Sequence, residues 1–203
     1  EDRKGNRPRF YYVLGQLYQL QGDKPAARVA YKRVLDLQPD SEMDFNARSQ
    51  QAQLEEDTKT SVTQLEKMAQ LDKHKDRLDQ IYGTIGNIYL EHQDTAKALE
   101  YYEKGIASST KNGLNKAAVL VAAGDIYYAQ RNYVKASPCY KEATQILSAE
   151  SDQHARIQRR SETLDELVVE HNTVVLQDSL QHLATLTEEE QLKVVEKIIA
   201  DLI

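Results

Sequence analysis

The sequence predicts an all-α solenoid, in which helix–turn–helix repeats stack side by side and C-terminal helices cap the last repeat. Three observations lead to this prediction. Only 8 Gly and 4 Pro occur among the 203 residues, so long stretches lack the residues that interrupt helices. A pattern of Gly, Ala and Tyr recurs with a period of about 34 residues, as in helical repeat arrays. After the last repeat, apolar residues continue at helical spacing.

The best match to the repeat lies at residues 8–41. It has an aromatic residue and a Leu-Gly pair in its first helix, a small residue and a tyrosine in its second helix, and a proline near its end. The matching residues are Tyr11, Leu14, Gly15, Tyr18, Ala27, Tyr31, Val34 and Pro39. These positions are typical of the tetratricopeptide repeat (TPR). Gly15 and Ala27 are expected to let the two helices approach closely, while the tyrosines fill the space beside them.

Three further units follow in register, at residues 42–75, 79–112 and 117–150. Two are strong, with Tyr82, Ile85, Gly86, Tyr89, Ala98 and Tyr102 in one and Leu120, Ala123, Gly124, Tyr127, Ala136, Tyr140 and Ala143 in the other. The unit at 42–75 is degenerate and retains Phe45, Ala52, Ser61, Leu65 and Met68. An ordinary helical bundle would explain the apolar spacing but not Gly and Tyr at recurring offsets. We therefore predict a TPR array over residues 8–150.

Local signals at the predicted turns support the helix boundaries. Asp23 and Asp94 stand where the second helix of a unit begins, and an aspartate at this position caps a helix. Pro25 suits the first turn of its helix. Pro138 lies inside the second helix of the last unit, where it removes one backbone hydrogen bond and is expected to kink the helix.

Residues 151–203 are predicted to form a helical cap followed by an amphipathic tail helix. Residues 152–186 make either one long helix or two helices with a break near residues 171–173, and they can cover the apolar face of the last repeat. Thr187 and Glu190 form a capping box that begins the final helix. The apolar face of this tail helix is a candidate protein-binding surface, formed by Leu192, Val195, Ile198, Ile199 and Leu202.

Composition and motifs argue against several classes of function. The net charge is −6 and no Lys/Arg-rich run occurs, so no nucleic-acid partner is expected. Cys139 is the only cysteine, and the five histidines lack the spacing of metal ligands. Phosphate-binding glycine loops and catalytic motifs are absent from the sequence. We therefore expect no catalytic residue, metal, cofactor or small-molecule substrate, and a buried structural thiol at Cys139.

The concave face of a TPR array is lined by the first helix of each unit. The residues at these positions predict a protein-binding groove formed by Tyr12, Gln16, Gln19, Asn46, Gln50, Gln53, Asn87, Leu90, Asp125 and Tyr128. Most of the polar residues in this set are amides, which donate and accept hydrogen bonds and suit an extended peptide or a polar helix. The basic set that grips a C-terminal carboxylate in chaperone-binding TPR proteins is missing. A plain solvated surface is the other interpretation of these residues.

Five segments carry a more specific similarity, at residues 12–19, 30–35, 42–48, 176–181 and 197–201. The sequences EMDFNAR at 42–48 and LQDSLQ at 176–181 are not required by TPR packing. Together the segments resemble the TPR lipoproteins of type IX secretion and gliding motility in Bacteroidetes (PorW/SprE-like). The resemblance implies a lipid-anchored protein on the periplasmic side of the outer membrane that connects other envelope components. Its lipidated cysteine would lie outside these residues, since the chain begins without Met and is expected to belong to a longer protein.

The function predicted from these observations is a non-catalytic scaffold that binds other protein subunits of the secretion and motility apparatus. Contact with the membrane is expected only through the lipid anchor, because no segment has the length of a membrane-spanning helix. Two alternatives stay open. One is a general TPR peptide-binding adaptor or co-chaperone, and the other is the regulatory arm of a larger enzyme.

Overall fold

The computed structural model describes residues 6–202, except for the side chains of residues 152, 197, 198, 201 and 202. This part of the chain contains ten α-helices, one 3₁₀ helix and no strand. In order they are α1 (Arg7–Leu20), α2 (Lys24–Asp36), α3 (Ser41–Gln53), α4 (Thr58–Ala69), η1 (Asp72–Arg77), α5 (Leu78–Glu91), α6 (Thr95–Ser108), α7 (Leu114–Ala129), α8 (Tyr133–Ile146), α9 (Asp152–Thr185) and α10 (Glu188–Leu202).

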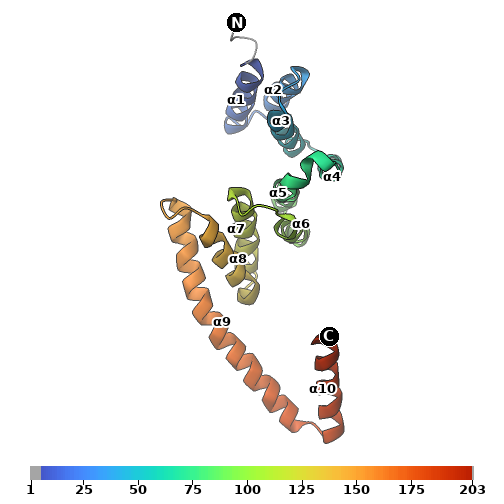
Figure 1. Ribbon diagram of the computed structural model, residues 1–203, viewed down its shortest axis with the longest axis vertical. Helices are drawn as coiled ribbons and strands as arrows, with labels where there is room; N and C mark the ends of the chain where they lie inside the picture. Colours follow the sequence, from blue (N-terminus) through green and yellow to red (C-terminus); the bar gives the residue numbers. More distant parts are fainter. Residues whose placement is uncertain (1–5, 203) are drawn as a thin grey trace.

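Helices α1 to α8 form four helical hairpins, in which α1 packs on α2, α3 on α4, α5 on α6 and α7 on α8. Figure 1 shows the hairpins following one another along the array. The core is distributed along the array in three clusters of buried apolar side chains, and residues from neighbouring hairpins contribute to each cluster. The predicted all-α solenoid is confirmed.

Short polar side chains begin five of these helices. Asp23 accepts a hydrogen bond from the Ala26 N–H at 3.0 Å, and Asp94 accepts one from the Lys97 N–H at 3.1 Å. The two predicted N-caps are therefore confirmed. The same contact begins α3, α4 and α8, where the caps are Asp40, Asp57 and Asn132.

In three of the four hairpins, a glycine of the first helix faces a fully buried tyrosine of the second helix. The pairs are Gly15 with Tyr31, Gly86 with Tyr102, and Gly124 with Tyr140. A methyl group added at either of the first two glycines would overlap the tyrosine ring. The close approach of these helices therefore depends on the missing side chain. In the degenerate unit, Ser49 and Leu65 occupy the corresponding positions, and the buried Ser49 Oγ has no hydrogen-bond partner.

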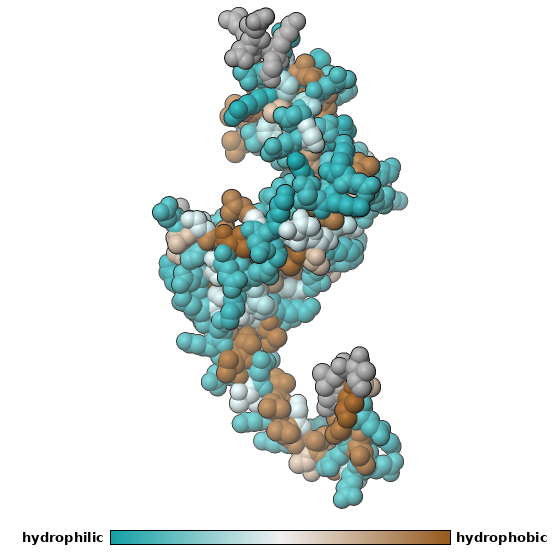
Figure 2. All heavy atoms as spheres, in the orientation of Figure 1, coloured by the Kyte–Doolittle hydropathy of each residue, from teal (hydrophilic) through white to brown (hydrophobic). Residues whose placement is uncertain are grey.

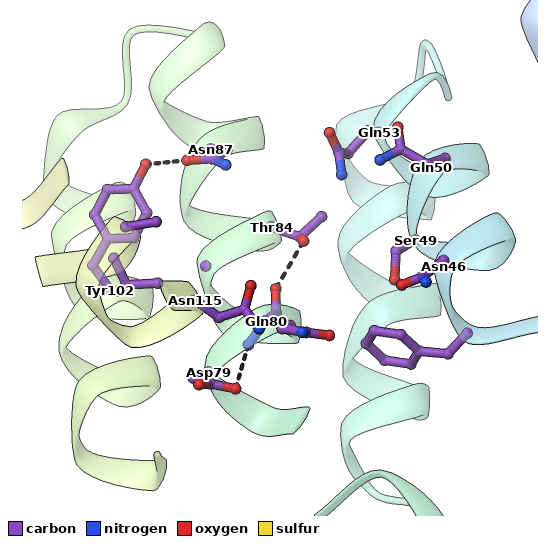
Figure 3. A pocket seen from close by; sticks show the side chains of 14 residues that line it. Asn46, Ser49, Gln50, Gln53, Asp79, Gln80, Thr84, Asn87, Tyr102 and Asn115 are labelled. Carbon is purple, nitrogen blue, oxygen red and sulfur yellow. Dashed lines mark hydrogen bonds between the residues drawn. The ribbon is translucent and has the colours of Figure 1, made fainter. Parts of the chain in front are cut away.

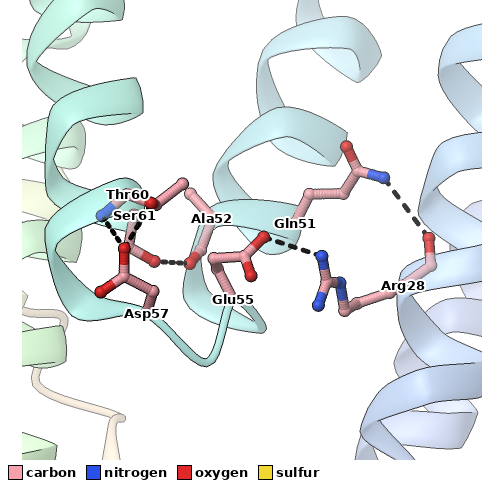
Figure 4. A network of polar contacts seen from close by, with 7 residues as sticks. All are labelled: Arg28, Gln51, Ala52, Glu55, Asp57, Thr60 and Ser61. Atoms are coloured by element: carbon pink, nitrogen blue, oxygen red, sulfur yellow. Dashed lines mark hydrogen bonds and ion pairs between the residues drawn. The ribbon is translucent and has the colours of Figure 1, made fainter.

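Polar contacts hold the degenerate unit in the array (Figure 4). The Arg28 guanidinium of α2 lies 2.7 Å from the Glu55 carboxylate, which follows α3. The Gln51 side chain donates to the carbonyl oxygen of Arg28 at 3.4 Å. On the other side of α3, the Ser61 hydroxyl donates to the carbonyl oxygen of Ala52 and connects α3 to α4. These contacts join α3 and α4, the two helices of the unit that lacks a Gly–Tyr pair, and connect that unit to α2 of the preceding hairpin.

The last hairpin tolerates its internal proline. Helix α8 continues on both sides of Pro138, whose side chain is exposed. Pro138 has no N–H to donate to the carbonyl oxygen of Val134, a residue that is 44% exposed, so water can satisfy this acceptor.

Residues after the repeats form one long helix, α9, with no break at residues 171–173. Its first half packs on α8 and buries Ile157 and Leu164 completely. The side chains of residues 169–182 are all exposed. This second half of α9 leaves the array, and α10 turns back at an angle to it (Figure 1). Glu190 accepts a hydrogen bond from the Thr187 N–H at 2.9 Å at the start of α10. Across the described helices, none combines the length and apolarity needed to cross a bilayer.

Candidate protein-binding groove

The concave side of the array contains a cleft of about 300 Å³ between α3, α5 and the start of α7. Figure 3 shows the labelled side chains of α3 on one side and those of α5 and α7 on the other. The residues that line the cleft are Phe45, Asn46, Ser49, Gln50, Gln53, Asp79, Gln80, Gly83, Thr84, Asn87, Tyr102, Asn115, Ala118 and Val119.

Four of the predicted groove residues line this cleft together. Asn46, Gln50 and Gln53 come from α3, and Asn87 comes from α5. Along α3, Asn46 and Gln50 are four residues apart and Gln50 and Gln53 are three apart, so the three amides share one face of the helix. The structure thus brings the amide-rich part of the predicted set to a single concave surface.

Gln19 extends the line of amides toward α1. Its side-chain N–H donates to the Gln50 Oε1 at 3.1 Å, and its own Oε1 accepts from the Tyr31 hydroxyl. A tyrosine of the Gly–Tyr pair therefore orients the amide of Gln19, and Gln19 orients the amide of Gln50. This chain of hydrogen bonds joins the first two units along the concave side.

Asn87 is oriented in the same manner. The Tyr102 hydroxyl donates to the Asn87 Oδ1 at 2.6 Å. Burial raises the pKa of Tyr102 to about 12, so the phenol stays protonated and can donate at neutral pH. Because its oxygen is engaged, Asn87 presents its NH₂ group to the cleft, as Figure 3 shows. A backbone carbonyl of a bound peptide is a suitable acceptor for this group.

The cleft also contains a carboxylate that the sequence analysis missed. Asp79 is only 7% exposed, and it accepts hydrogen bonds from the Gln80 N–H at 2.9 Å and the Ser109 hydroxyl at 3.1 Å. The Ser109 Oγ also lies 3.0 Å from the Lys111 carbonyl oxygen, and its single proton cannot serve both acceptors at once. None of the cleft-lining residues is Lys or Arg. Asp79 is therefore a mostly buried carboxylate without a cationic partner in the cleft.

The other predicted groove residues lie elsewhere on the concave side. Tyr12 packs edge-on against Tyr31, with 5.4 Å between the ring centroids. Gln16 lines a shallow hollow on α1 beside Leu17. Leu90 lines a second, more open cleft of about 640 Å³ along α7. These residues do not meet the α3–α5 amides in one cavity.

Asp125 and Tyr128 contact α9. The Arg160 guanidinium donates to the Asp125 Oδ1 at 2.5 Å and lies 4.9 Å from the centroid of the Tyr128 ring. The Tyr140 hydroxyl donates to the same Asp125 oxygen at 2.6 Å. The first half of α9 thus occupies the concave side of the last unit, where a ligand groove was predicted to continue.

The predicted tail surface is exposed where the structure describes it. Leu192, Val195 and Ile199 are all at least 43% exposed. The side chains of Ile198 and Leu202 lie outside the described part of the structure. This surface lies on α10, away from the α3–α5 cleft (Figure 1).

Chemical reactivity is low at the one cysteine. Burial, with smaller contributions from Glu142 and Glu103, raises the pKa of the Cys139 thiol to about 11. The thiol is therefore protonated at neutral pH and is a poor nucleophile. Among the described residues, no three His, Cys, Asp or Glu side chains are grouped as metal ligands.

Comparison with known proteins identifies the repeat. The tetratricopeptide repeat family matches residues 8–41 and, as a longer repeat description, residues 77–149. The two matches cover more than half of the chain and leave out the degenerate unit. No curated protein matches the chain.

Solved structures with similar folds include BtubC (BKLC) from P. vanneervenii. It is 18% identical with a TM-score of 0.61, over 81% of this chain and 74% of that one. The MamA protein is 18% identical with a TM-score of 0.46, over 90% of this chain and 98% of its own. Pseudomonas aeruginosa pilF is 16% identical with a TM-score of 0.44, over 96% and 99%. At this identity, the likeness to BtubC shows the fold alone.

Proposed function

Since this chain is a tetratricopeptide-repeat protein, we propose that it is a non-catalytic scaffold that binds another protein in the cleft between α3, α5 and α7. The observation that carries the proposal is the lining of that cleft. Asn46, Gln50, Gln53 and Asn87 converge on it, and the amide of Asn87 is held in place by a buried tyrosine. Preoriented amides lose less side-chain entropy of their own when a segment binds.

The chemistry of the cleft favours an extended polypeptide. Amide side chains hydrogen-bond both the N–H and the C=O groups of a peptide backbone, so they do not require a particular sequence. The lining contains no Lys or Arg to hold a carboxylate. A ligand that binds through its C-terminal carboxylate is therefore disfavoured.

Asp79 adds a preference for positive charge. The Asp79 carboxylate is mostly buried and accepts hydrogen bonds from at most two neutral donors. A cation that approaches such a carboxylate stabilises its negative charge. A Lys or Arg side chain of the bound segment supplies that cation. We therefore assign to the cleft an extended segment with a basic residue beside Asp79.

Substituting Gln50 and Asn87 with arginine is expected to abolish capture of the partner. The longer cationic side chains fill the cleft and repel a basic segment. The measurement is affinity purification with the tagged chain from solubilised cell envelopes, followed by mass spectrometry. The matched control is Gln16→Arg, an identical change on α1 outside the cleft, which should retain the partner. Capture by the double variant at the wild-type level, with unchanged circular dichroism, would place the binding surface elsewhere.

Asp79→Asn is expected to weaken binding of a captured basic segment by about tenfold, which corresponds to about 1.4 kcal/mol. Asparagine has the same shape but no charge, so the fold should be preserved. Fluorescence anisotropy with a peptide from the partner, and with its Lys/Arg→Gln counterpart, measures the effect. If the carboxylate selects the basic residue, Asp79→Asn should leave the affinity of the neutral peptide unchanged. An equal loss for both peptides would contradict the assigned role.

The identity of the partners is proposed on sequence resemblance. The segments at residues 42–48 and 176–181 support a periplasm-facing, lipid-anchored component of type IX secretion and gliding motility, whose partners are other envelope subunits of that apparatus. The same envelope purification tests this assignment, because secretion and motility subunits should be enriched. Enrichment of a chaperone would favour the general adaptor, and enrichment of one enzyme would favour a regulatory arm.

A further inference from the structure

The first helix has an exposed apolar stripe. The stripe consists of Phe10, Val13, Leu17 and Leu20, which follow one helix face at intervals of three and four residues. All four are exposed, and Leu20 reaches 85%. We call this stripe the α1 face.

Positions of this stripe are buried apolar residues in the other three hairpins. The residues that correspond to Phe10 and Leu17 are Ile81 and Ile88 in α5 and Val119 and Ile126 in α7, and all four are buried. In the degenerate unit the buried residues are instead Ala47 and Leu54, which correspond to Val13 and Leu20. These six residues belong to clusters that also contain residues of the preceding hairpin, such as Val34, Leu65 and Tyr102. The α1 face is therefore the stacking surface of a repeat, shaped to receive a helical element from the direction of the N-terminus.

At the other end of the chain, residues 168–202 form an arm that leaves the array. Exposed apolar side chains follow both of its helices, with Val169, Leu176 and Leu180 on one face of α9 and Leu192, Val195 and Ile199 on α10. Figure 2 shows this apolar surface along the arm, and Figure 1 shows that α10 diverges from α9 instead of packing along it. Contiguous exposed apolar surface of this kind marks an interaction site.

The first hairpin and the arm carry opposite net charge. Residues 6–41 have six Lys/Arg and three Asp/Glu, a net charge of +3, whereas residues 168–202 have two Lys and seven Asp/Glu, a net charge of −5. One surface hollow beside Phe10 is lined by Arg7, Arg33 and Asp36. Charge complementarity of this kind steers association and excludes like-charged pairings. Two arms placed side by side would bring two acidic segments together.

We propose that the arm of one copy docks on the α1 face of a second copy, so that copies of this chain associate head to tail. The arm takes the place that a preceding hairpin takes in the later units, with its apolar side chains against Phe10, Leu17 and Leu20. The interface joins two different surfaces, so a pair of copies keeps one unused α1 face and one unused arm, and the assembly grows beyond a dimer.

Sedimentation velocity over a range of micromolar concentrations tests the proposal. The wild-type chain should increase in average mass beyond that of a dimer as concentration rises, and added salt should weaken the association. The head-blocked variant, Leu17→Glu with Leu20→Glu, and the tail-blocked variant, Leu176→Glu with Leu180→Glu, should each associate at least about 100-fold more weakly, since an unpaired charge is buried in an apolar contact. The control Leu114→Glu, exposed at the start of α7, should behave as wild type.

Mixing the two blocked variants distinguishes head-to-tail docking from the alternatives. Each variant retains one working surface, so the equimolar mixture should form a one-to-one dimer and nothing larger. A head-blocked variant that still dimerises would show that two arms bind each other and would overturn the proposal. A wild-type chain that stays monomeric at every concentration would overturn it as well. The substituted side chains are exposed, so unchanged circular dichroism is expected for all variants.

Discussion

Gly86→Ala is expected to lower the free energy of unfolding by about 3 kcal/mol, because a methyl group there overlaps the ring of Tyr102. That ring is fully buried and its hydroxyl is bonded to Asn87, so neither end of the side chain can move away without cost. Urea denaturation followed by circular dichroism measures the change. Gly105→Ala is the control, since its nearest neighbours lie at 3.4 Å or more and alanine favours the helix by up to about 1 kcal/mol.

The degenerate unit suggests how the loss can be recovered. At the corresponding positions it carries Ser49 and Leu65, a larger residue on the first helix and a smaller one on the second. The double variant Gly86→Ser with Tyr102→Leu should therefore lose less stability than the sum of the two single variants, since the overlap is relieved. If Gly86→Ala were as stable as Gly105→Ala, the Gly–Tyr contact would not limit the approach of these helices.

Leu164→Ala is expected to lower the free energy of unfolding by about 3 kcal/mol, because it removes a side chain that is only 1% exposed where α9 covers the last hairpin. Helix α9 is the terminal cap of the array, and a repeat array needs such a cap over its last apolar face. The amides of α8 should then exchange hydrogen faster, since local opening of the cap exposes them. Thermal unfolding and hydrogen exchange measure the two effects.

A matched control lies one turn further along the same helix. Leu167 is 40% exposed, so Leu167→Ala should cost less than about 1 kcal/mol. The pair separates the covering role of α9 from its helix propensity, which the two substitutions change equally. Equal losses for both variants would contradict the view that Leu164 anchors the cap.

The candidate groove shows where prediction from sequence stops. The amides at Asn46, Gln50 and Asn87 could be assigned to the concave side because they occupy the first-helix positions that line this side of a TPR array. Asp79 was missed since an acidic residue in the first turn of a helix is ordinarily explained by the helix dipole. Its burial depends on Ser109 and Asn115, which approach from the connection before α7 and the helix itself. No local pattern encodes that approach.

The sequence by itself determined the repeat and the N-caps, because each depends on residues within one hairpin, whereas the contact of Gly86 with Tyr102 is seen only in the structure. Only the tertiary structure decided that Arg160 of α9 engages Asp125 and Tyr128, and that α9 continues as a single helix into an arm. The same apolar spacing in α9 fits a buried cap and an exposed arm equally well. What separates them is the length of the array, because α8 offers contacts only to the first half of α9 and the second half is exposed.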